Sequence, residues 1–256
     1  MNTRLNVRER LGAAGWHLIA SLVVATLVAV LVFGLWFPGA YRIMAGGRDL
    51  LVLIMVVDVI LGPVLTFTAY NINKTRRHLR RDIATIAILQ LAALGYGLHT
   101  VYLARPVALV FEYDRFRVIS AAEVLIEELP KAPPEFRRLS FSGPKLMAVR
   151  KAVAGSERSA ALMTAALDGV DTSQRPMFWI PYGVHERGLA KNAGRRLSRL
   201  VKQYPDAMPV INTFLNDHGM TLASAVFLPI RARGDAVAVL TSEGNIAGFL
   251  PYDGFF

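Results

Sequence analysis

The chain has 256 residues, of which 54% are hydrophobic, and it carries a formal net charge of +10 without a single cysteine. Its apolar content exceeds that of an ordinary soluble domain. The lack of cysteine excludes a disulfide framework, a thiolate nucleophile and a cysteine-ligated metal site. Half of the ten Lys and Arg residues in the first 103 positions lie at 71–82. This clustering is typical of a membrane topology signal and not of a nucleic-acid surface, so we expect no nucleic-acid partner.

The first long apolar run extends from Trp16 to Phe37 and follows Arg4, Arg8 and Arg10. A basic start before an apolar run is also typical of a signal peptide. This run, however, is longer than the roughly 7–15 residues of a signal-peptide core. The pattern therefore favours a retained membrane anchor.

The second apolar run, from Leu50 to Tyr70, is long enough to cross a bilayer as a helix. It contains one carboxylate, Asp58, and one helix breaker, Gly62-Pro63. An ionisable group at this depth costs roughly 2.5–3.5 kcal/mol on insertion scales, so Asp58 should face other helices or a wet cavity. Pro63 lacks a backbone N–H and crowds the preceding turn, which predicts a bend and a carbonyl near Val59 without its usual partner.

The third apolar run covers Ile83 to Tyr102 and follows the basic loop at 71–82. By the positive-inside rule, the N-terminus and this loop are cytoplasmic. Three crossings, at 16–37, 50–70 and 83–102, then form a transmembrane domain over residues 1–103. They place residues 104–256 in the periplasm of a bacterium, so we expect a multi-pass protein of the inner membrane.

A set of polar residues and helix breakers forms the candidate partner-binding or bundle site. With a rise of about 1.5 Å per residue, Asp58, Tyr96 and Thr26 reach a similar depth. The hydroxyls of Tyr96 and Thr26 could donate hydrogen bonds to Asp58 and hold the bundle together. Alternatively, Asp58 could engage another membrane segment, or it could relay a proton or an ion. Gln90, at the depth of Pro63, is a candidate partner for the freed carbonyl. The candidate site comprises Asp58, Gly62, Pro63, Gln90, Tyr96 and Thr26.

Residues 104–256 alternate short patterned segments with turns, which predicts an α+β domain with antiparallel strands. Strands are expected at 107–111 and 116–119, and a three-stranded meander at 222–230, 236–241 and 246–250. Helices are expected at 121–129, 157–167, 188–203 and 208–218. The helix at 188–203 carries a basic face, typical of a solvated surface. Its functional alternative is contact with anionic headgroups or an acidic partner.

Motifs of the common enzyme and nucleotide-binding classes do not occur in the sequence. His185-Glu186 and Asp217-His218 are isolated pairs, and a Ser–Lys dyad within 140–145 is a weak pattern. His17 reads as an ordinary interface histidine at its helix end. We therefore predict no enzymatic activity, no catalytic residues, no cofactor and no metal.

Three stretches together resemble a known family: Trp16-His17-Leu18, VDVILGP at 57–63, and RRDIATIAILQLAALGYGLHTVYLARPVALVFEYDRF at 80–116. They are similar to the TfpX/TfpZ family of type IV pilin accessory proteins, bacterial inner-membrane proteins that assist pilus assembly. The resemblance covers about the first 120 residues, and the ending IAGFLPYDG is the closest later part. It implies a non-enzymatic assembly helper whose partner is the major type IV pilin, met through its N-terminal helix and its head domain. Other pilus-assembly components and the lipid bilayer are further candidate partners.

A rival reading is a membrane-bound sensory or transport subunit. In that reading Asp58 titrates and the periplasmic domain binds a small ligand.

Overall fold

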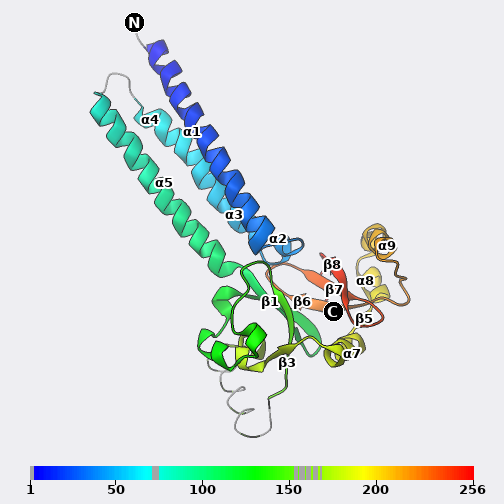
Figure 1. Ribbon diagram of the computed structural model, residues 1–256. Coiled ribbons are helices and arrows are strands. Elements are labelled where there is room, and N and C mark those ends of the chain that lie inside the picture. Colours follow the sequence, from blue (N-terminus) through cyan, green and yellow to red (C-terminus); the bar gives the residue numbers. More distant parts are fainter. Residues whose placement is uncertain are drawn as a thin grey trace. The chain divides into compact units, whose positions relative to one another are not determined.

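The computed structural model describes residues 3–70, 75–152 and 169–256, together with Gly155, Ser159, Met163 and Leu167 (Figure 1). The chain divides into two compact units. A helical unit comprises Met1–Gly39 and Gly47–Ala104, and a sheet unit comprises Ala40–Gly46 and Arg105–Phe256. The helix expected over 157–167 lies largely outside the described residues.

The helical unit contains three helices that are long and apolar enough to cross a membrane, as predicted: Val7–Trp36, Gly47–Ala69 and Arg76–Ala104. The first consists of α1 (Thr3–Leu31) and a π-helical turn (Val32–Trp36). The second consists of α3 (Gly47–Val56), a π-helical turn (Val57–Leu61) and α4 (Gly62–Ala69). The third is α5 (Arg76–Ala104), which begins within the basic segment instead of after it.

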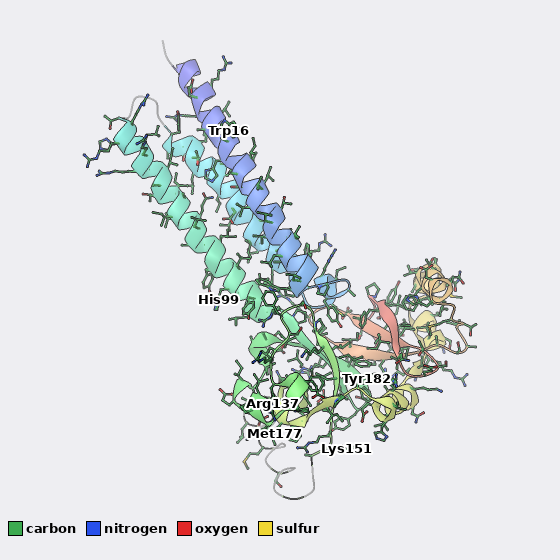
Figure 2. All side chains as sticks on the ribbon, in the orientation of Figure 1. Trp16, His99, Arg137, Lys151, Met177 and Tyr182 are labelled. Atoms are coloured by element: carbon green, nitrogen blue, oxygen red, sulfur yellow. The ribbon has the colours of Figure 1, made fainter. Side chains whose placement is uncertain are left out.

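Large apolar side chains cover the outside of the helical unit. Leu27 on α1 and Leu53 on α3 are each 66% exposed, and Leu91 on α5 is 67% exposed. Trp16 also projects outward, near one end of the first apolar run (Figure 2). An apolar surface of this extent is typical of helices that face lipid. Near the other ends of α1 and α5, Trp36 and Tyr102 make an edge-to-face ring contact at 5.4 Å.

The sheet unit is built around a mixed sheet of eight strands among the described residues. Its order is β4-β3-β1-β2-β6-β7-β8, and β5 pairs with β6. The strands are β1 (Pro106–Glu112), β2 (Arg115–Ser120), β3 (Lys145–Val149), β4 (Trp179–Pro181), β5 (Arg195–Arg196), β6 (Val226–Arg231), β7 (Ala236–Leu240) and β8 (Ile246–Leu250). Nearly all of β1 is buried, as expected for an inner strand covered on both faces.

The expected antiparallel sheet is only partly correct. The β1–β2 hairpin and the β6-β7-β8 meander are antiparallel, as predicted. However, β1 pairs with β3 and β2 pairs with β6 in parallel. Parallel neighbours need long connections, so their partners are distant in sequence and strand periodicity does not reveal them.

Two of the expected helices take another form. Residues 121–129 form 3₁₀ turns, at Ala121–Glu123 and Ile126–Lys131, because Val124 and Leu125 are not helical and Pro130 cannot extend an α-helix. The segment 188–203 breaks at Gly194 into α7 (Val184–Ala193) and α8 (Leu197–Gln203), and β5 between them pairs with β6. The third, α9 (Met208–Asp217), is confirmed.

Residues 40–46, between the first two membrane-length helices, belong to the sheet unit. They contain the short helix α2 (Tyr41–Met44). Met44 is 2% exposed and packs in one core cluster with Phe111. Its carbonyl accepts a hydrogen bond from Gly234 N at 2.9 Å, and the Tyr41 ring meets Phe249 at 5.7 Å. Burial raises the pKa of the Tyr41 hydroxyl. Met44 and Tyr41 therefore anchor residues 40–46 to the core of the sheet unit.

Candidate binding site in the helical unit

Asp58 lies in a π-helical turn that directly precedes the proline of the second span. Pro63 occupies the first turn of α4, the position in a helix where proline is best tolerated. The turn at Val57–Leu61 absorbs the change of hydrogen-bond register before that restart. Such single π turns are frequent at functional sites. This one holds Asp58 with only 8% of its surface exposed.

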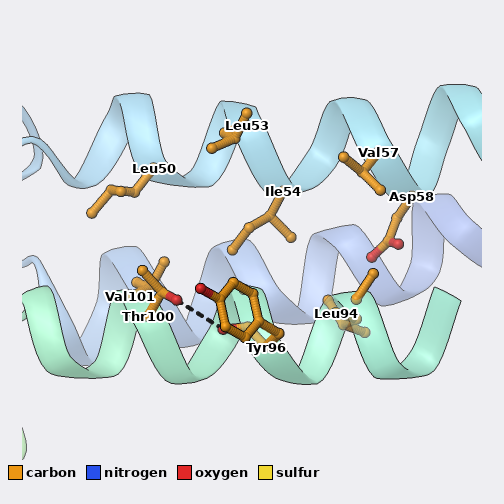
Figure 3. A pocket seen from close by; sticks show the side chains of 11 residues that line it. Leu50, Leu53, Ile54, Val57, Asp58, Leu94, Tyr96, Thr100 and Val101 are labelled. Atoms are coloured by element: carbon orange, nitrogen blue, oxygen red, sulfur yellow. Dashed lines mark hydrogen bonds between the residues drawn. The ribbon is translucent and has the colours of Figure 1, made fainter. Parts of the chain in front are cut away.

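The Asp58 carboxyl group is buried without full hydrogen bonding. Its Oδ1 atom has no hydrogen-bond partner among the described residues. The side chain is directed away from the second span, toward the neighbourhood of Leu94 on α5 (Figure 3). Burying a polar group without a partner costs about 1–3 kcal/mol, and more if the group is charged. The arrangement is therefore unfavourable for the bundle by itself.

The two hydroxyls expected to bond Asp58 do not do so. Thr26 Oγ1 donates to the carbonyl of Leu22 on its own helix, at 2.8 Å. Tyr96 borders the same cavity as Asp58, but its side chain is 76% exposed, and no hydrogen bond joins it to Asp58 in the described part of the chain. Helical rise gives only the depth of a residue, whereas its rotation about the helix axis decides which side chain it contacts.

Gln90 lies beside Gly62, at the start of α4. A Cβ atom built on Gly62 would clash with the Gln90 side-chain amide and would come within 2.9 Å of His17 Nε2. The absence of a side chain at Gly62 thus makes room for both residues. The expected bond from Gln90 to the Val59 carbonyl is not found in the described residues, and the backbone around Val59 forms a π-helical turn.

Three further polar residues join the site, and the sequence interpretation missed them. His17 Nδ1 and Thr66 Oγ1 are 2.6 Å apart, and Thr66 and Ser21 are 4% and 8% exposed. His17 is not at a helix end, because α1 extends from Thr3 to Leu31. Their spacing along the sequence could have identified them, because residues four apart lie on the same face of a helix. His17 and Ser21 share one face of α1, and Asp58, Gly62 and Thr66 follow at the same interval along the second span.

Two cavities meet at Asp58. We call the first the α3–α5 groove; it has a volume of about 320 Å³ and an almost wholly apolar lining that includes Leu53, Ile54 and Val57 from the second span. From α5 it is lined by residues including Gly97 and Thr100. The second cavity, of about 210 Å³, is more polar, since His17, Ser21 and Gln90 contribute to it. Asp58 and Leu94 line both.

The helices α3 and α5 approach each other closely at Gly97, within the lining of the α3–α5 groove. A Cβ atom on Gly97 would come within 2.9 Å of Ile54 Cγ1, so the glycine permits that contact. Small residues at helix contacts have this effect in membranes. Beyond the contact, α5 is sparsely packed. In its most apolar stretch 6% of the residues are buried, compared with 22% in each of the other two spans. One flank of Asp58 is thus open to an additional apolar segment.

Several charged residues of the sheet unit form ion pairs within it. Glu128 accepts from Arg175 Nε at 3.0 Å, both residues are buried, and the guanidinium lies 5.0 Å above the Phe178 ring. Asp171 pairs with Arg117. Burial, together with the carboxylate of Asp171, raises the pKa of the Glu112 carboxyl at the end of β1.

The isolated pairs that might have suggested catalysis are used in local hydrogen bonds. Glu186 accepts from Gly183 N at 3.1 Å at the start of α7, and His218 Nδ1 lies 2.8 Å from the Phe214 carbonyl. Lys145 Nζ donates to a backbone carbonyl, that of Glu135, at 2.6 Å. In the described residues, no group of three or more potential metal ligands occurs.

Comparisons with known proteins place the chain in a family. The fimbrial assembly protein of serogroup I of Dichelobacter nodosus is 35% identical over 244 residues, which cover 94% of this chain and 95% of that protein. The chain belongs to the fimbrial assembly protein family. The serogroup E1 member of the family, from the same bacterium, is 36% identical over 248 residues, with the same coverage of both chains. The member of serogroups C1 and C2 is 43% identical over 119 residues, 46% of this chain.

A family model agrees with these relatives. The model described as Fimbrial assembly protein FimB matches residues 5–46. The match begins in α1, which contributes His17 and Ser21 to the cavities, and it ends with the segment Ala40–Gly46 that packs in the sheet unit. No solved structure shows a significant match to this family member.

Proposed function

We propose that this protein is a type IV pilin accessory protein of the TfpX/TfpZ kind, which handles pilin at the bacterial inner membrane and acts by direct contact with it. The observation that carries the proposal is the near full-length similarity to relatives named fimbrial assembly proteins. The three membrane-length helices agree with it, because a pilin's apolar N-terminal helix would share the same bilayer. In this proposal the protein is non-catalytic and assists pilin as a chaperone does.

The topology supports a periplasmic sheet unit. Residues 40–46 and 105–256 fold together, so they lie on one side of the membrane. The chain between them contains two membrane-length helices, an even number of crossings, as this arrangement requires. The opposite ends of these helices carry the basic residues of the 71–82 segment, and positive charge favours the cytoplasm. The sheet unit is then available to meet the pilin head.

A pull-down from native membranes tests the proposal. The tagged protein is crosslinked in pilus-producing cells, purified, and searched for pilin by mass spectrometry. An unrelated tagged three-span protein, produced at the same level, is the control. We expect recovery of the major pilin with this protein only. Recovery of other pilus-assembly components without pilin would indicate that the protein is a component of the assembly machinery. Recovery of neither would favour the sensory or transport alternative.

A further inference from the structure

The α3–α5 groove combines an apolar surface with one unsatisfied polar atom. Its lining comes from the second span and from α5, and its volume of about 320 Å³ is about twice that of an engineered apolar cavity large enough for benzene. A space of this size admits side chains but not a whole helix. An apolar segment lying along the groove could insert such side chains into it.

The carboxyl group of Asp58 limits what can occupy the groove well. The side chain is more than nine-tenths buried, and its Oδ1 atom lacks a partner in the described chain. The nearby ring of His17 is engaged through Nδ1 with Thr66. A lipid acyl chain would match the apolar lining but would offer Asp58 no hydrogen bond. A segment with an N–H, O–H or ammonium group at this level would match both features.

We propose that the α3–α5 groove seats an apolar membrane helix of the partner protein, and that this helix donates a hydrogen bond to Asp58. The inference rests on the proposed function, which makes the partner a pilin, and adds to it the place and the chemistry of recognition. The partner helix inserts apolar side chains between α3 and α5. Its donor group satisfies the carboxyl oxygen that the three helices leave without a partner.

Site-specific photocrosslinking tests where the partner lies. A photoreactive residue is placed at Leu53 or Tyr96, two groove residues whose side chains are 66% and 76% exposed. The matched control is Leu27, which is 66% exposed on α1 and outside both cavities. In membranes that contain pilin, we expect adducts with the pilin helix from the two groove positions and background yield from Leu27. Equal yields from all three positions would overturn the proposal.

Substitution of Asp58 tests the hydrogen bond. Hydrogen bonds between membrane helices contribute amounts that correspond to a roughly three- to twentyfold change in binding. We therefore expect Asp58→Leu to lower the crosslink yield by about that factor, and Asp58→Asn, which keeps an acceptor oxygen, to lower it less. Asp49→Asn, at the start of the same span and not among the residues that line the groove, is the control and should change nothing. An unchanged yield in Asp58→Leu would overturn the proposal.

The outcomes distinguish the site from the function. Membrane abundance of each variant is measured first, and Asp58→Asn decides the matter if Asp58→Leu does not accumulate. If the pull-down recovers pilin while the groove positions give only lipid adducts, the groove proposal fails and the proposed function stands. If the pull-down recovers no pilin either, both fail.

Discussion

Shortening Met44 to alanine tests whether the segment between the first two spans is an integral part of the sheet unit. Met44 is 2% exposed, whereas its neighbour Ile43 is 63% exposed. The backbone bond from Gly234 to the Met44 carbonyl remains in the variant, so the loss comes from side-chain packing alone. Met-to-Ala changes in cores cost about 2–5 kcal/mol. For a domain of this size, that loss lowers the melting temperature by roughly 5–15 °C.

The lack of cysteine provides a simple assay for this prediction. Ala238 in β7 is fully buried, so a cysteine placed there reacts with a thiol reagent only after the sheet unit opens. The labelling midpoint on heating is compared for Met44→Ala and Ile43→Ala in this background, in detergent. Ile43→Ala should change stability by less than about 0.5 kcal/mol, as surface changes do. Equal midpoints for the two variants would refute the packing of this segment in the core.

Three further predictions use similar measurements. Glu128→Gln leaves the buried guanidinium of Arg175 without its carboxylate and should cost about 3–5 kcal/mol in the same labelling assay; a loss under about 1 kcal/mol would contradict the role of this pair. Because the pKa of Glu112 is raised, this carboxylate destabilises the fold at pH 7, and the effect disappears as the pH falls below the ordinary value of 4.5. Glu112→Gln should therefore melt higher than the parent at pH 7 and equally at pH 4, and a lower midpoint at pH 7 would argue against this burial effect. The valine side chain in Gly62→Val should clash with Gln90, cost about 1–3 kcal/mol of stability and reduce membrane abundance. Adding Gln90→Ala should restore part of the lost abundance. No recovery in the double variant would show that the two residues do not compete for space.

Patterns that depend on neighbours in sequence predicted much of this fold. Hydropathy identified three membrane-length helices, because an apolar run of about 20 residues has few other stable forms. Alternation and turn residues located the β1–β2 hairpin and the β6-β7-β8 meander. What the patterns could not give was pairing over distance. The parallel contact between β2 and β6 joins residues more than 100 positions apart, Phe116 and Ile230 among them.

The candidate site shows the same division. Asp58, Gly62 and Pro63 were identifiable because each is exceptional in an apolar helix. Thr26 was misplaced as a partner of Asp58, because depth does not fix the direction in which a side chain points. Thr66 was missed because a lone hydroxyl in an apolar run is usually bonded within its own helix, as Thr26 is to Leu22. Its contact with His17 depends on how two helices pack.

The packing around Asp58 agrees with the proposal that this residue binds a partner helix. A structural role would satisfy the carboxyl group within the bundle, yet the described helices leave one of its oxygens without a partner. Polar side chains that line the cavity beside Asp58 are placed otherwise in the described residues: His17 contacts Thr66 through Nδ1, Gln90 lies against Gly62, and no bond joins Ser21 to the free Oδ1 atom. An apolar residue at position 58 would remove the cost of an unpaired polar group. Natural sequences usually retain an unpaired buried polar group only where function needs it. In the groove proposal, a hydrogen-bond donor from the partner helix pairs with the free oxygen of Asp58.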